Sequence, residues 1–131
     1  MERLLVRSRD AWTKALELEP SNPRALWIKA AGYLYSPPER GGSYDKAIEI
    51  YHEMERSAGV PDPTSPFPDW GKPEALMSLA FAHLNHPKDR DAAGALEEAR
   101  AALKLQPEWH YVKDILVPQI EAARTATAAR E

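Results

Sequence analysis

The sequence contains no cysteine, which excludes disulfide bonds, thiolate catalysis and zinc sites built on cysteine. It also lacks any apolar run near the ~20 residues that a helix needs to cross a membrane, so no membrane insertion is expected. The opening Met1–Val6 is too short and too soon charged for a signal peptide, and it leaves the compartment of this soluble chain open. Basic residues are not in excess either, because the net charge is −3 and both signs are interspersed along the chain. This argues against a nucleic-acid-binding protein.

Valine, isoleucine and threonine are scarce whereas alanine, leucine and glutamate abound, a composition that favours helix over strand. The 12 prolines fall mostly between stretches whose apolar residues recur at spacings of three and four. The sequence therefore predicts an all-α protein of about six helices in a single domain, 1–131. Its expected parts are a half repeat at 1–20, a repeat at 22–58, a long loop at 59–72, a repeat at 73–106 and a capping helix at 107–125.

Local signals place several helix ends. Asn22 is a plausible N-cap followed by proline at the first helical position, and Ser43 can cap the next helix. The paired prolines and glycines of 36–42 predict an irregular loop. A helix is expected from about Asp89 to 105, and Pro118 predicts a kink inside the last helix, which should cover the apolar face of the helix before it.

Two stretches of the chain repeat each other. Residues 14–20 match 101–107, and residues 22–26 match 72–76. The recurring unit is a helix, a turn, a helix and a closing proline. Such self-similarity, with a period in the thirties to forties of residues, is typical of a helical solenoid in which each hairpin needs its neighbour to bury its apolar face.

At this point the chain resembles the tetratricopeptide-repeat family. One repeat is carried by Leu26, Ala30, Tyr33, Ala47, Tyr51 and Met54. A second is carried by Leu76, Leu79, Ala80, His83, Ala95, Ala99, Ala102 and Pro107. The second helix of a preceding repeat, whose first helix lies before the start, is carried by Ser8, Trp12, Ala15 and Pro20. The resemblance implies a helical-hairpin solenoid that binds other proteins and is not an enzyme.

More narrowly, the chain is similar to the C-terminal part of bacterial tetratricopeptide proteins of unassigned function, many of which look exported. The similarity rests on the segments 22–24, 37–38, 41–42, 46–48, 68–71 and 113–118.

Each candidate for chemistry has a simpler structural interpretation. His83 and His86, with Asp89 nearby, could in principle bind a metal, but His83 occupies an inter-helix packing position and His86 a turn. Gly41-Gly42 lacks the lysine and strand of a phosphate loop, and Ser43 has no histidine at a suitable spacing. The acidic pairs at 53/55 and 97/98 are expected on outward faces. We therefore expect no catalytic residue, no cofactor and no metal.

A groove is the better candidate site. In solenoids of this family the first helix of each hairpin lines the concave side, which assigns the groove to Arg24, Trp27, Ile28, Ala31, Tyr35, Glu74, Met77, Ser78, Phe81 and Tyr111. The residues expected to contact a partner are Arg24, Trp27, Ile28, Tyr35, Met77, Phe81 and Tyr111. The face lacks the basic, amide-rich clamp of the family's groove for acidic C-terminal tails. An amphipathic helix or apolar peptide is the expected partner.

Self-association is the alternative to a free groove. The segment 60–70 carries Phe67 and Trp70 between prolines and could fold over the groove. A second copy of the chain could fill it in a homodimer, since Leu4, Leu5 and Trp12 lie on a helix with one face left without a neighbour. The sequence leaves the choice between these alternatives open.

Overall fold

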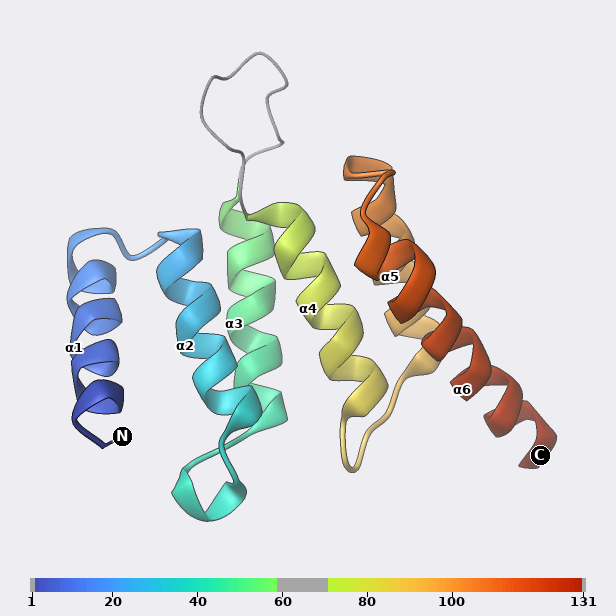
Figure 1. The fold of residues 1–131 in the computed structure, drawn as a ribbon, viewed down its shortest axis with the longest axis horizontal. Coiled ribbons are helices and arrows are strands. Elements are labelled where there is room, and N and C mark those ends of the chain that lie inside the picture. The colour runs from blue at the N-terminus through green and yellow to red at the C-terminus, as the bar shows by residue number, and fades with distance from the viewer. Residues whose placement is uncertain (1, 59–70, 131) are drawn as a thin grey trace. The chain divides into compact units, whose positions relative to one another are not determined.

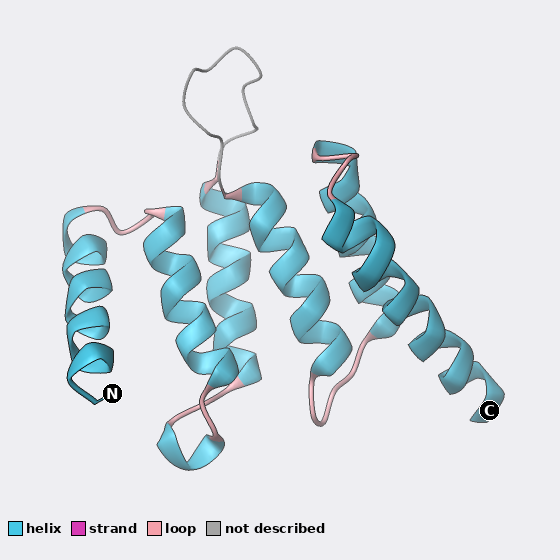
Figure 2. Ribbon diagram, in the orientation of Figure 1, coloured by secondary structure: helices cyan, strands magenta, loops and turns pink. Residues whose placement is uncertain are grey.

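The computed structural model describes residues 2–58 and 71–130, and in these ranges all regular secondary structure is helical (Figure 1; Figure 2). The predicted all-α class is thus confirmed for the described residues. None of their helices combines the length and apolar character that crossing a membrane requires. The elements are α1 (Glu2–Leu18), α2 (Pro23–Tyr35), η1 (Pro38–Arg40), α3 (Tyr44–Ser57), α4 (Lys72–Asn85), α5 (Ala92–Leu105), η2 (Tyr111–Leu116) and α6 (Val117–Arg130).

The chain divides into two compact units, Met1–Gly71 and Lys72–Glu131. In unit 1, α1 packs against α2 and α2 packs against α3. In unit 2, α4 packs against α5, and α5 contacts both η2 and α6. The boundary falls at the end of the predicted long loop, of which residues 59–70, with Phe67 and Trp70, lie outside the described residues.

The predicted entry to α2 is confirmed. The side-chain oxygen of Asn22 accepts hydrogen bonds from the backbone N–H groups of Arg24 and Ala25, each at 3.1 Å. Pro23 occupies the first helical position, where its missing N–H has no intrahelical partner to lose. The N-cap Asn22 and the proline at the first helical position therefore both place the start of α2 at Pro23.

Between α2 and α3 the structure is more regular than the expected loop. Pro38–Arg40 form a short 3₁₀ turn, because a proline fits the first position of such a turn. Gly41 ends the turn at φ 89°, a left-handed conformation that favours glycine. The Ser43 N–H then donates to the Tyr33 carbonyl at 2.9 Å, and the Ser43 hydroxyl caps α3 by accepting the Lys46 N–H at 3.2 Å.

Among the described residues of unit 1, the buried apolar side chains come from α2 and α3. Small residues alternate with large ones, as close helix packing requires. The set is Ala25, Leu26, Ala30, Leu34, Ala47, Tyr51 and Met54. Of the described side chains of α1, none is buried, although Trp12, Ala15 and Leu16 are half-buried.

Unit 2 has a core cluster that its last helical segment completes. The cluster consists of Ala80, Leu84, Ala95, Leu96, Ala99, Val112, Leu116 and Ile120. The prediction that the last helix covers the apolar face of the fifth is therefore confirmed. Three expected bounds were wrong: α5 starts at Ala92, after the N-cap Asp91, and the last helical segment starts at Tyr111 instead of near 107 and continues to Arg130 instead of ending near residue 125.

The distortion expected at Pro118 takes the form of a π-helical segment just before it. Residues 111–116 are π-helical, and the Val117 N–H reaches back five residues to the Val112 carbonyl. Pro118 supplies no N–H, and its ring crowds the carbonyl one turn earlier. A wider turn on the N-terminal side accommodates both effects while the helix continues as α6.

Candidate functional site

Four of the seven residues predicted to contact a partner lie on α2, in unit 1. Ile28 is 43% exposed and Tyr35 is 71% exposed, and both are large apolar side chains. Arg24, Ile28, Ala31 and Tyr35 follow one another at spacings of three and four, so they share one face of the helix. We call these four residues the α2 strip. Trp27, next to the strip, is half-buried.

The three predicted contact residues of unit 2 are less exposed. Met77 and Tyr111 pack against the core cluster, and Phe81 is half-buried. Glu74 and Ser78, also expected along the groove, are 9% and 5% exposed. Met77 and Tyr111 thus already contribute to the core of unit 2, and their role in binding stays a prediction.

Three further exposed hydrophobic side chains lie on α1: Leu4, Val6 and Leu18. With Ile28 and Tyr35 they make five of the six large hydrophobic residues that the described chain exposes, and the sixth is Ile115 of unit 2. The exposed apolar surface is therefore concentrated on α1 and α2. The sequence predicted an unpartnered side of α1 but no binding residue on it.

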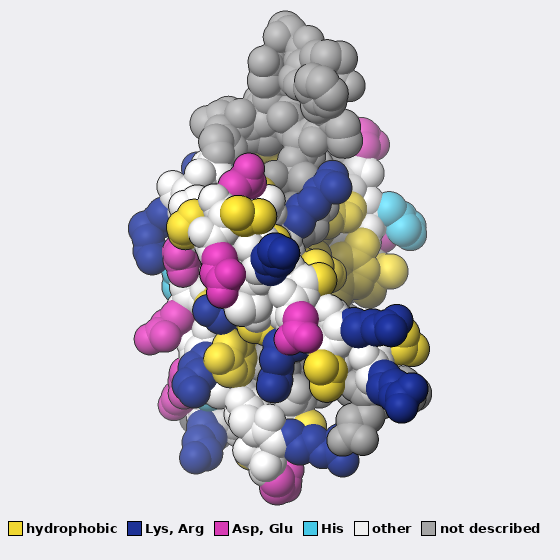
Figure 3. Space-filling model, turned by 90° about the vertical axis from the view of Figure 1, so that its left-hand side faces the viewer, with side chains coloured by type: hydrophobic (Ala, Val, Ile, Leu, Met, Phe, Trp, Pro, Cys, Tyr) yellow, Lys and Arg dark blue, Asp and Glu magenta, His cyan; other side chains and the backbone are white. Residues whose placement is uncertain are grey.

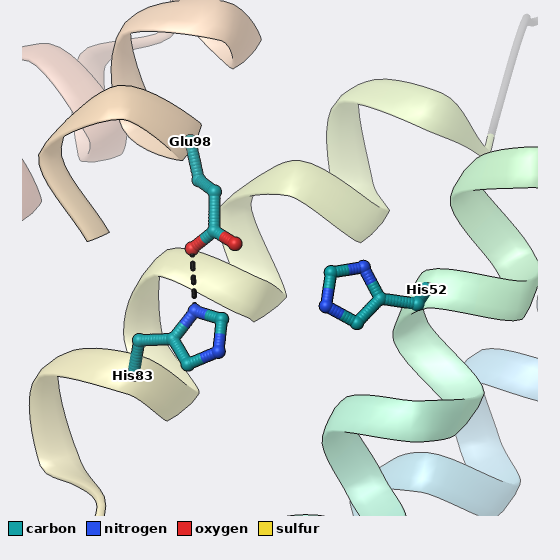
Figure 4. A group of neighbouring side chains, drawn as sticks. All are labelled: His52, His83 and Glu98. Atoms are coloured by element: carbon teal, nitrogen blue, oxygen red, sulfur yellow. Dashed lines mark hydrogen bonds and ion pairs between the residues drawn. The ribbon is translucent and has the colours of Figure 1, made fainter. Parts of the chain in front are cut away.

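His83 of α4 and Glu98 of α5 meet inside unit 2. Their Nδ1 and Oε2 atoms lie 2.8 Å apart (Figure 4). The hydrogen bond to Glu98 raises the pKa of His83 above its usual 6.5, and the negative charges of Glu98 and Asp91 act in the same direction, against the opposing effect of burial. The packing interpretation of His83 is supported, because the pair joins two neighbouring helices.

The outward placement expected for Glu98 was wrong. Glu98 is half-buried, and it lies three residues after Ala95 and four before Ala102, both of which are fully buried. The same helical spacing that identified the alanine stripe could have placed Glu98 beside it. Glu97, in contrast, is exposed as expected.

His86 closes the turn between α4 and α5. Its ring is 6% exposed, and its Nδ1 accepts the backbone N–H groups of Lys88 and Asp89 at 3.2 and 2.9 Å. Pro87 has no N–H, so these two are the first donors after the ring. One of the two ring nitrogens of His86, Nδ1, is thus engaged by the backbone.

Comparison with protein-family models, with curated proteins and with solved structures finds no match to this chain.

Proposed function

We propose that this chain is a non-catalytic helical-repeat scaffold of the tetratricopeptide type that binds a protein or peptide through exposed apolar side chains. The observation that carries the proposal is the α2 strip, on which Ile28 and Tyr35 remain 43% and 71% exposed. A solvent-exposed isoleucine and tyrosine on one helix face offer an incoming apolar segment surface to bury. Arg24 at the start of the strip supplies a charge that can fix the direction of the ligand.

The two histidines have structural roles in unit 2. His83 is joined to Glu98 across two helices, and His86 accepts two backbone N–H groups in a turn. The hydrogen bonds of His83 and His86 thus account for the positions of these two side chains. An amphipathic helix or apolar peptide remains the ligand class that fits the strip.

The repeat type is supported by the order of packing within each unit. Helices adjacent in sequence pack together in α1–α2–α3, and again in α4–α5 followed by η2 and α6. The alanines at 30 and 47 in one unit, and at 80 and 95 in the other, are all fully buried where helices approach. Small residues at repeated positions are what a stack of similar helical units needs.

The proposal can be tested by selecting ligands from a displayed peptide library on the immobilised chain. Selected peptides are expected to be apolar or amphipathic. The double variant Ile28→Glu/Tyr35→Glu should bind them at least about tenfold more weakly, because two charges replace the apolar anchors. Ile115→Glu, at the exposed isoleucine of unit 2, is the matched control and should bind like the wild type. Selection of no peptide, or equal losses in both variants, would contradict the proposal.

Self-association through the same surface is the competing function. Light scattering at several concentrations separates the two on wild type, Trp27→Ala and the double variant. A monomer at all concentrations supports a surface kept for other molecules. A dimer that the substitutions convert to monomer would instead assign the surface to a second copy of the chain.

A further inference from the structure

A row of exposed side chains runs along α1 at heptad spacing. Leu4, Arg7, Ala11, Lys14 and Leu18 follow at intervals of three, four, three and four residues, and all five are exposed. We call them the α1 row. This spacing keeps side chains in line along a helix that faces another helix. The row is distinct from the half-buried face of α1, on which Trp12, Ala15 and Leu16 lie roughly a third of a turn away.

The composition of the row alternates apolar and basic. The apolar members are Leu4, Ala11 and Leu18, and the leucines are 68% and 76% exposed. Arg7 and Lys14 lie between them. Among the described side chains neither cation has an ion-pair partner. The face on which α1 lies shows separate apolar side chains among lysines, arginines and acidic residues (Figure 3).

We infer that the α1 row docks an acidic amphipathic helix of another protein, with apolar residues opposite Leu4, Ala11 and Leu18 and carboxylates opposite Arg7 and Lys14. Charge complementarity selects this occupant, since each cation sits between two apolar contacts, where a facing carboxylate is partly shielded from water. The small side chain of Ala11 leaves room for a large apolar residue of the partner between the two leucines.

A second copy of α1 is a poor occupant of the row. Parallel pairing would set Arg7 against Arg7 and Lys14 against Lys14. Antiparallel pairing centred near Ala11 would bring Arg7 of one copy beside Lys14 of the other. Like charges meet in both orientations, and facing like charges cost stability.

A membrane surface is also a poor occupant. Lipid binding by a helix lying in the interface requires a broad apolar face that sinks below the headgroups. The α1 row is one residue wide, and the exposed Asp10 and Glu17 lie beside it. These carboxylates would face the headgroups of an anionic bilayer. In helix pairing they flank the row, where basic residues of the partner can pair with them.

The test uses a pair of labelled helical peptides about three heptads long, both with leucine at the first position of each heptad. One peptide carries glutamate at the fourth position and the other carries lysine. Fluorescence anisotropy should show that the wild type prefers the glutamate peptide by at least about tenfold, a preference that salt weakens. Arg7→Glu/Lys14→Glu should reverse the preference. Arg100→Glu/Lys104→Glu, with the same change of charge on exposed positions of α5, should retain it.

Reversal in the α1 variant alone, with circular dichroism showing that all three proteins are folded, would establish the inference. It is overturned if the wild type binds neither peptide, or both equally, or if the α5 variant also reverses. A dimer that Arg7→Glu/Lys14→Glu strengthens would assign the row to self-pairing, and cosedimentation of the wild type with phosphatidylserine vesicles without peptide binding would assign it to lipid. The preference between the two peptides tests α1 alone, whereas the Ile28→Glu/Tyr35→Glu variant tests the α2 strip, so a lost preference and a failure of the proposed function are distinguishable.

Discussion

The two terminal helical segments of the described chain use their apolar residues in opposite ways. In unit 2, η2 and α6 contribute Val112, Leu116 and Ile120, each with 0% exposure, to the core cluster. In unit 1, α1 is a helix of 17 residues, yet Leu4 and Leu18 are 68% and 76% exposed. Similar residue types therefore stabilise the fold in one unit and remain on the surface in the other.

The difference separates the apolar side chains that stabilise the fold from those that the proposed docking would use. Full burial of a leucine, isoleucine or valine contributes roughly 1.5–3 kcal/mol relative to leaving it exposed. Val112, Leu116 and Ile120 each contribute burial free energy of this size to unit 2. Their apolar character is therefore explained by the stability of the fold. The exposed leucines of α1 gain little of it, and a binding role gives them a physical reason.

The largest expected effect compares one leucine from each end. Leu116→Ala should lower the free energy of unfolding by about 2–5 kcal/mol, because it opens a cavity in the core cluster. Leu18→Ala should change it by less than about 0.5 kcal/mol, because the side chain is already in water. Urea denaturation followed by circular dichroism measures both. Equal losses would show that α1 is packed as tightly as η2 and would remove the contrast.

The next effect compares two side chains that close turns in the same way. Asn22 in unit 1 and His86 in unit 2 each accept the backbone N–H groups two and three residues ahead. Because His86 is buried and Asn22 is not, we expect His86→Ala to destabilise by about 2 kcal/mol and Asn22→Ala by about 1 kcal/mol. His86→Asn restores an acceptor and should recover part of the loss. If His86→Asn is as damaging as His86→Ala, the ring matters through packing and not as an acceptor.

The sequence was most informative where a local pattern determines the structure by itself. The N-cap at Asn22, the cap at Ser43 and the alanine stripe of α5 each depend on neighbours within one turn of helix, and all three are confirmed. The position of Pro118 predicted a disturbance, but the form it takes depends on the packing of Val112 and Leu116. That packing requires the tertiary structure.

The candidate site was harder to predict because exposure depends on several elements at once. Periodicity placed Ile28 and Met77 in the same class, yet Ile28 is exposed while Met77 packs against the core cluster. Likewise, His86 and Lys88 are two residues apart in a turn, and the hydrogen bond between them requires a particular backbone path. Local spacing alone contains no signal that distinguishes these cases.

The smallest expected effect is a change in the free energy of unfolding with pH. It tests whether the His83–Glu98 pair between α4 and α5 stabilises unit 2. The pKa of His83 is raised in the folded chain, so the folded state holds the His83 proton more tightly than the unfolded state does. The stabilisation by the His83–Glu98 pair should therefore be fully present below pH 6.5 and decline as the pH rises through the raised pKa. Urea denaturation across this range should show the decline in the wild type and its loss in Glu98→Gln. Asp114→Asn, which alters the exposed pair formed with His110, is the control and should keep the decline, since solvent screens exposed charges. A profile unchanged by Glu98→Gln would mean that the 2.8 Å contact contributes no measurable stability, and that apolar burial alone joins the two helices.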